Sequence, residues 1–257
     1  MKSKKIFLHI LFMVLVVTAI PAVQANAGVK NDGSDEEIDS FFEQEETFDP
    51  LESLNRVFFV VNDKLYYWVL KPVSTAYTAV LPQDVRLGLG NFFVNVAAPV
   101  RVVNNLLQGK VGDAGIDFQR FLINSTLGFA GFGDPAKEAF GIKAKPEDFG
   151  QTLGVWGLGE GAYLYLPFLG PLTCRDAVGF VGNAALHPAT YVLTDFPEEA
   201  AYTGTDKVNL MSLHPGLYED MKKNSLDPYI SIRQAYLEYR RNKVLDKDVK
   251  TNVFREE

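Results

Sequence analysis

Cysteine is almost absent from this sequence, which contains Cys174 and no other cysteine. A single cysteine excludes a disulfide within the chain. It also excludes lipidation at an export signal, because that modification needs a cysteine just after the cleavage site. Cys174 has no histidine or second cysteine beside it. We therefore expect a small buried apolar side chain there, not a nucleophile or a metal ligand.

Histidine is scarce as well, and the usual catalytic motifs are missing. His187 and His214 each precede a proline, lie far apart and lack the spacing of metal ligands. There is no Gly-x-Ser-x-Gly nucleophile turn and no phosphate-binding P-loop. The glycines from Gly157 to Gly161 lack the preceding strand and following helix of a dinucleotide site. The sequence predicts no catalytic residue, no metal, no cofactor and no enzymatic activity.

Positive charge is never concentrated in one stretch, and the formal net charge is −7. The absence of a basic stripe argues against nucleic-acid binding, and the absence of a polybasic patch argues against attraction to anionic lipid heads. Eight acidic residues lie between Asp32 and Glu46, without a single base. This stretch has no hydrophobic periodicity, so we predict an acidic disordered tether over residues 28–48.

The N-terminus has the pattern of an export signal. Lys2, Lys4 and Lys5 precede an apolar run from Ile6 to Ile20, and Pro21 and small residues follow. The run is shorter than the roughly 20 residues that span a bilayer. A signal peptide over residues 1–27, cleaved after export, is therefore favoured over a retained anchor helix.

The rest of the chain is rich in apolar residues with helical spacing. Hydrophobic residues make up 47% of the sequence, enough for a sizeable core. Aspartate before proline at Asp49, Asp134 and Asp227 predicts helix starts, because the carboxylate accepts from the first turn and proline suits the first helical position. The helix after Asp49 is apolar nearly all round, as in helices that are buried or face lipid, and Pro72 is expected to end it.

Further helices are predicted at about residues 84–97, 100–108, 111–122 and 174–186, the last of them capped by Thr173. A C-terminal helix follows Asp227, and the tail after Val244 is charged. No set of alternating strands and no internal repeat is evident. The sequence therefore predicts an all-α domain over residues 49–244 and a charged tail over residues 245–257.

The segment from Gly150 to Thr173 differs from the rest, because it combines six glycines and two prolines with many large apolar residues. It is too broken for a membrane helix. Non-helical backbone at membrane depth is tolerated only inside protein or around a wet cavity. Two interpretations stay open on the residues alone: a loop that lines a passage, and a tightly packed loop between helices.

Ordered sequence blocks then point to a family. They are Asp49-Pro50-Leu51-Glu52-Ser53-Leu54-Asn55-Arg56, Asn104-Asn105-Leu106-Leu107-Gln108-Gly109, Phe149-Gly150-Gln151-Thr152-Leu153-Gly154 and Leu166-Pro167-Phe168-Leu169-Gly170-Pro171. Arg175-Asp176 and Asp227-Pro228-Tyr229-Ile230 follow them. These blocks span about residues 49–239, and the chain resembles the MlaA/VacJ proteins of outer-membrane phospholipid transport.

The resemblance implies a ring of amphipathic and apolar helices in the inner leaflet of the outer membrane, around a central amphipathic channel. It implies removal of misplaced phospholipid from the outer leaflet and its transfer to a soluble MlaC-like carrier in the periplasm, which maintains lipid asymmetry. A trimeric porin is the implied partner. The missing lipidated cysteine departs from the family pattern, so we expect the helical ring and the porin to provide attachment.

The site residues that follow from the loop and the family motifs fall into two groups. The predicted passage comprises Phe149, Gly150, Gln151, Thr152, Gly154, Gly157, Gly161, Tyr163, Pro167 and Gly170. The residues of the family motifs that are expected to be structural are Asn55, Arg56, Asn91, Asn104, Gln108, Gly109, Arg120, Asn124, Arg175 and Asp176, and helix-to-helix hydrogen bonds are expected of Asn55, Asn91 and Asn124.

Two other functions compete with lipid transport. One is a structural adaptor that binds an outer-membrane porin without moving lipid. The other is a lipid hydrolase, which would depend on His187 or His214.

Overall fold

The computed structural model describes residues 49–246, so the predicted signal peptide, the acidic tether and the tail from Lys247 lie outside the described residues. The elements, in chain order, are α2 (Glu52–Leu65), η2 (Tyr66–Leu70), α3 (Lys71–Val80), α4 (Gln83–Val96), α5 (Ala98–Leu107), α6 (Val111–Thr126), α7 (Pro135–Glu138), α8 (Phe149–Val155), β1 (Tyr163–Leu166), β2 (Gly170–Thr173), α9 (Cys174–Leu186), α10 (Ala189–Val192), α11 (Phe196–Leu213), α12 (Leu217–Lys223) and α13 (Pro228–Val244).

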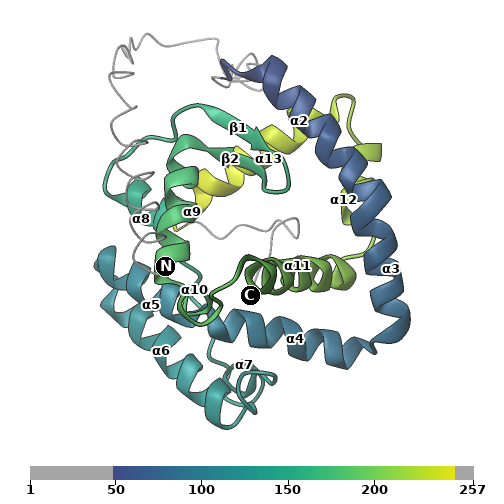
Figure 1. Ribbon diagram of the computed structural model, residues 1–257. Coiled ribbons are helices and arrows are strands. Elements are labelled where there is room, and N and C mark those ends of the chain that lie inside the picture. Colours follow the sequence, from purple (N-terminus) through teal and green to yellow (C-terminus); the bar gives the residue numbers. More distant parts are fainter. Residues whose placement is uncertain (1–48, 247–257) are drawn as a thin grey trace.

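The helices form a closed frame (Figure 1). Helices α2 and α3 make one side, α4 makes the next, and α5 and α6 fill the corner where α8 and α9 begin the opposite side. The hairpin of β1 and β2 and helix α13 complete the frame beside α2, and α11 packs on α3 and α4. The predicted all-α ring is confirmed, with one short hairpin added.

Most predicted helices are present with nearly the expected bounds. Helices α4 and α5 meet next to Pro99, α6 starts at Val111, and α9 starts after Thr173 and ends at Leu186. Helix α8 lies inside the glycine-rich segment and was not predicted, because its glycines argue against a helix. Helix α11 was also missed, since its sequence shows only weak amphipathicity.

The expected end of the first helix at Pro72 is wrong. Residues Tyr66–Leu70 form a π-helical turn, and α3 continues directly from it with Pro72 in its first turn. Proline is tolerated in a first turn, because the backbone N–H that it lacks has no partner there. The wider π turn restarts the hydrogen-bond ladder, so the proline falls at a new beginning and not in a helix interior.

A second correction concerns strands. Strands β1 and β2 pair antiparallel, with Tyr163 opposite Thr173 and Leu166 opposite Gly170. Tyr163 and Tyr165 point into the main apolar cluster together with Phe59, Tyr229 and Ile232. The hairpin therefore supplies one wall of the core, although its strands are too short for a clear alternation.

The predicted caps have mixed outcomes. Asp134 accepts from the backbone N–H of Lys137, and Asp227 accepts from those of Tyr229 and Ile230, as expected. Thr173 likewise caps α9 through the N–H of Asp176. Asp49 does not cap α2, whose N-cap position is Leu51.

The carboxylate of Asp49 is bound by distant side chains instead. It accepts from Asn55 Nδ2 at 2.9 Å, from Arg233 Nη1 at 2.9 Å and from the hydroxyl of Tyr229. The two partners on α13 lie about 180 residues further along the chain, so local spacing could not reveal them. Asp49 thereby ties the start of α2 to the last helix.

The distribution of polarity is unusual for a globular domain. Among the described residues, buried polar side chains outnumber buried apolar ones, whereas large apolar side chains are exposed on most helices. The exposed fraction is 72% for Trp68 and 77% for Val80. No helix within residues 49–246 is long and apolar enough to cross a bilayer.

Asn55 provides a test of how the hairpin is attached. Its side chain donates to the carbonyl of Tyr163 at 3.0 Å and accepts from the N–H of Tyr165 at 2.9 Å. Asn55→Ala leaves these buried groups without partners, so we expect the free energy of unfolding to fall by about 2 kcal/mol or more. Chemical denaturation measures this, with exposed Ser53→Ala on the same helix as the control; equal values for both variants would contradict the attachment.

Candidate functional site

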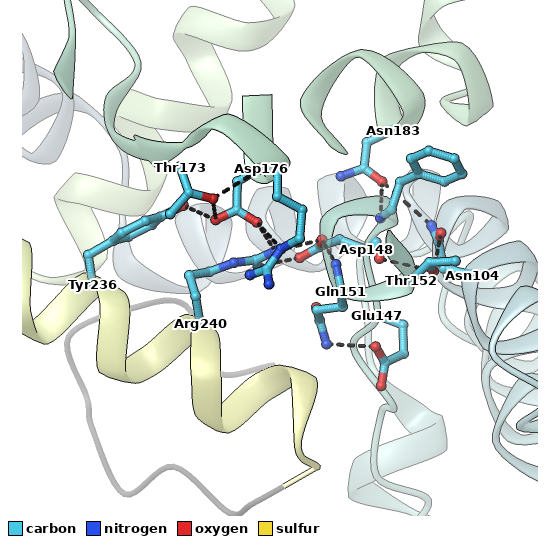
Figure 2. Close-up of polar contacts among 12 residues, drawn as sticks. Asn104, Glu147, Asp148, Gln151, Thr152, Thr173, Asp176, Asn183, Tyr236 and Arg240 are labelled. Atoms are coloured by element: carbon cyan, nitrogen blue, oxygen red, sulfur yellow. Dashed lines mark hydrogen bonds and ion pairs between the residues drawn. The ribbon is translucent and has the colours of Figure 1, made fainter. Parts of the chain in front are cut away.

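Several of the predicted site residues lie where α8, α9 and α13 meet, in a cluster that we call the polar junction (Figure 2). Arg240 of α13 is at its centre. Its guanidinium contacts Asp148 at 2.5 and 2.9 Å and Asp176 Oδ1 at 2.7 Å. The other oxygen of Asp176 accepts from Tyr236 at 2.7 Å and from Thr173 at 2.8 Å. One arginine therefore joins the starts of two helices.

The electrostatics of the junction favour the ionised form of Asp148. Burial on its own would raise the pKa of Asp148, but the charge and hydrogen bonds of Arg240 and the backbone N–H of Gln151 hold this pKa below its ordinary value. Asp148 is also the N-cap of α8, where the helix dipole favours negative charge. The carboxylate is therefore a fixed structural anion.

A second branch of the polar junction links α8 to α5. Thr152 donates to Asn104 Oδ1 at 2.8 Å, and the N–H of Phe149 donates to Asn183 Oδ1 at 2.8 Å. Both Asn104 and Thr152 are fully buried. Asn104, one of the predicted motif residues, therefore links α5 to α8 through Thr152.

Glu147 completes this branch. Its carboxylate accepts from Gln151 at 2.6 Å, from Gln108 at 2.8 Å and from Lys110 at 2.9 Å. Burial raises the pKa of Glu147, and the hydrogen bonds from Lys110 and Gln108 only partly oppose this. The group is nevertheless surrounded by donors, so it has the environment of a structural bridge.

Glycines permit the close approach of α8 and α9. A Cβ on Gly150 would lie 2.6 Å from Asp176 Oδ1 and 2.7 Å from Arg240 Nη2. A Cβ on Gly182 would lie 2.4 Å from the ring of Phe149, and one on Gly154 would lie 2.8 Å from Val244. The glycines of the α8 block therefore make room for neighbouring side chains.

The structure divides the predicted passage residues into packed and open positions. Phe149, Gly150, Gln151, Thr152, Gly154 and Tyr163 lie in helix or strand contacts. Gly161 has a φ of +69° and faces Cys174, which is only partly buried. Gly157 and Gly170 have positive φ and open space around them, and Pro167 lies beside the latter at the hairpin turn.

Other motif residues make local bridges away from the junction. Arg120 and Asn124 both bind the carboxylate of Asp134, at 2.9 and 2.8 Å. This pairing keeps the pKa of Asp134 low despite partial burial. Arg56 pairs with Glu52 and Asp227 at 2.8 Å each.

The remaining motif residues have simpler surroundings. Asn91 donates to the carbonyl of Phe132 at 3.2 Å. Gly109 has a φ of +77° in the turn after α5. Arg175 is buried, and its Nε lies 3.5 Å from Asp176 Oδ1.

Sequence reasoning missed Asp148 and Arg240, although each leaves a trace. Asp148 lies three residues before Gln151, which is the spacing of a capping box. Arg240 lies four residues after Tyr236 and seven after Arg233, so these side chains share one face of α13. The stripe of arginine and tyrosine on one face of α13 was the available indication.

The contacts of the polar junction are those of a structural site that holds helices together. Its carboxylates are paired with arginine, lysine or amide donors, and His187 and His214 belong to other parts of the ring. Within residues 49–246, no three histidine, cysteine or acidic side chains are close enough together to bind a metal.

Removal of the central cation is the most direct test of the junction. Arg240→Met removes the cation shared by the buried carboxylate of Asp176 and the partly buried carboxylate of Asp148, so we expect a loss of about 3–5 kcal/mol in the free energy of unfolding. The neighbouring Arg241 forms an exposed pair with Glu160 at 3.2 Å, and Arg241→Met should cost at most about 1 kcal/mol. Thermal or chemical unfolding of both variants measures the difference; similar losses would contradict a central role for Arg240.

The lowered pKa of Asp148 predicts a specific acid dependence. Its contribution to stability is fully present above the ordinary aspartate pKa of about 4 and is lost as the pH falls through the lower folded-state value. Asp148→Asn should therefore be less stable at neutral pH and lose less stability between about pH 4 and pH 2. Denaturation curves across this range measure the slope, and a variant with the slope of the unsubstituted protein would contradict the assignment.

The family model and the similar proteins point to the same family. The model of the family described as MlaA lipoprotein matches residues 47–243. The intermembrane phospholipid transport system lipoprotein MlaA of Shigella flexneri is 36% identical over 201 residues, which cover 76% of this chain and 78% of that protein. The protein of the same name from Escherichia coli is 35% identical with the same coverage. An uncharacterized protein of Rickettsia conorii is 34% identical over 74% of this chain and 75% of its own length.

A solved structure shows the same fold. It is described as the structural basis for maintenance of bacterial outer membrane lipid asymmetry, and it superimposes with a TM-score of 0.65 at 34% identity. The match covers 76% of this chain and 98% of that one. The chain therefore belongs to the MlaA lipoprotein family.

Proposed function

We propose that the protein removes mislocalised phospholipid from the outer leaflet of the outer membrane and passes it to a soluble MlaC-like carrier in the periplasm. Relatives at 35% and 36% identity are named as lipoproteins of an intermembrane phospholipid transport system. The activity would maintain the lipid asymmetry of the outer membrane. It requires no covalent step, in keeping with the absence of nucleophile and P-loop motifs from the sequence.

The observation that carries the proposal is the inverted polarity of the ring. Buried amide and charged groups hold the helices together, while valine, leucine and aromatic side chains are exposed on α2, α3, α5 and α6. Monomeric water-soluble proteins rarely expose extensive apolar surface, because each 100 Å² of it in water costs about 2.5 kcal/mol. A leaflet of acyl chains is the solvent that suits such a surface.

Attachment to the periplasmic face of the outer membrane would follow from the same surface. The relatives are named lipoproteins, but the single cysteine of this chain is Cys174, in α9. The apolar faces of the ring would replace an acyl anchor, and a trimeric porin would hold the ring in place. Both are proposals about this chain.

The passage is proposed to follow the segment from Phe149 to Gly170. Its packed residues would form the wall, and its open turns at Gly157 and Gly170 would be the points where a headgroup meets the chain. Substitutions at Gly154 or Gly161 are unsuitable tests, because a Cβ would lie 2.8 Å from Val244 or 2.9 Å from Cys174 and disturb the packing. The open glycines avoid this problem.

Gly157→Glu and Gly170→Glu test the passage in cells that lack their own family member. A carboxylate there should repel lipid phosphate, so outer-leaflet phospholipid, measured by its digestion with added phospholipase, should accumulate several-fold. Gly141→Glu is the matched control, because Gly141 also combines a positive φ with open space and carries the same backbone strain. It should behave as the unsubstituted chain.

Porin co-purification distinguishes transport from the adaptor alternative. Retained porin binding with lost lipid removal supports the passage. Unchanged lipid removal in both glutamate variants would contradict it, and loss of porin binding together with lipid removal would favour the adaptor. Release of fatty acid from vesicles by the purified protein, abolished by His187→Ala or His214→Ala, would instead establish a hydrolase.

A further inference from the structure

An open apolar groove lies on α2 and η2. Its lining residues are Val60, Val61, Lys64, Leu65, Trp68 and Val69. The lining is apolar apart from Lys64, and Trp68 is 72% exposed. The groove is separate from the polar junction and from the proposed passage, which are built from other segments of the chain.

Lys64 distinguishes this groove from an ordinary apolar patch. Its ammonium lies 5.2 Å from the centroid of the Trp68 ring, and none of the ion pairs of the described residues includes it. The nearby lysines are neutralised: Lys71 lies 2.6 Å from Glu219, and Lys222 lies 2.6 Å from Asp63. Lys64 therefore lines the groove with its apolar stem, and its ammonium, beside the Trp68 ring, has no carboxylate partner among the described ion pairs.

The backbone of the groove contains a π-helical turn. The groove spans the change from α2 to the π-helical turn, and Trp68 and Val69 lie within that turn. Such turns are rare and are frequently found at functional sites. Tryptophan beside lysine is also the combination found where a membrane's acyl region meets its headgroups.

We propose that this groove binds one phospholipid of the surrounding leaflet, with an acyl chain on the valines and Leu65 and the headgroup phosphate at Lys64. A phospholipid supplies both complements, an alkyl chain and an anion, in a single molecule. A partner helix would have to bury Lys64 and bring its own carboxylate. The inference rests on the membrane placement proposed above, but it concerns a lipid held on α2 and η2 and not one in transit.

Trp68 provides the reporter, because the chain has two tryptophans and Trp156→Phe removes the other. The full processed chain carrying Trp156→Phe is reconstituted in nanodiscs of phosphatidylethanolamine and phosphatidylglycerol. Bromine atoms at the 6,7 or 11,12 positions of a minor fraction of the lipid quench nearby tryptophan emission. We expect the 6,7 lipid to quench Trp68 more strongly, since Lys64 would hold the headgroup end beside the ring.

A brominated diacylglycerol with the same chains tests the phosphate. The phospholipid should quench at a several-fold lower mole fraction than the diacylglycerol, and Lys64→Gln should abolish this difference. Lys143→Gln is the charge-matched control, because Lys143 is exposed and lies outside the groove. Native mass spectrometry of the same proteins should show one retained phospholipid, reduced about tenfold by Lys64→Gln alone.

The following results would overturn the site. Equal quenching by the phospholipid and the diacylglycerol, or no effect of Lys64→Gln, would reduce the groove to a surface that faces bulk lipid. Absence of quenching in a protein that is embedded in the nanodisc would mean that another protein surface covers the groove. Failure of the proposed transport would appear in a separate experiment: cells carrying Gly157→Glu or Gly170→Glu would have the same outer-leaflet phospholipid as cells carrying the unsubstituted chain.

Discussion

Closure of the ring depends on two buried arginines of its last helix. Arg233 pairs with Asp49 at the start of α2, and Arg240 pairs with Asp148 and Asp176 at the starts of α8 and α9. A buried charge without its partner is strongly unfavourable, so these pairs form together or leave the helix unattached. Helix α13 therefore joins elements from the first and middle parts of the described chain, and Figure 1 shows it crossing the frame where the hairpin meets α2.

This arrangement explains the distribution of apolar residues. Polar groups supply much of the specificity between helices, so valine, leucine and aromatic side chains are free to face outward. The main apolar cluster is small and lies between α2, the hairpin and α13. The remaining apolar surface needs a non-aqueous environment, and membership of the MlaA lipoprotein family gives that need a physiological setting.

Local interactions were predictable from the sequence, and distant ones were not. The caps at Asp134, Thr173 and Asp227 follow from spacing over three residues, and the structure contains them. Asp49 has the same signature but binds residues of α13, because a buried arginine competes better for a carboxylate than an exposed helix end.

The glycine-rich segment shows the same limit. Gly150 and Gly157 are equivalent in sequence, yet the first lies against Asp176 and Arg240 and the second has open space. Which glycine is packed depends on helices that come later in the chain. Sequence blocks identified the family and many of the contact residues. Only the three-dimensional structure distinguishes the residues that are packed between helices from those in accessible turns.

The proposed function requires the exposed apolar faces of this ring to lie in a lipid leaflet. Flotation of residues 28–257, produced without an acyl chain, with phosphatidylethanolamine and phosphatidylglycerol vesicles on a density gradient tests this placement. We expect the protein to rise with the vesicles and to stay with them at high salt, because apolar contact holds it there. A monomer that remains at the bottom of the gradient, free of lipid and detergent, would contradict it.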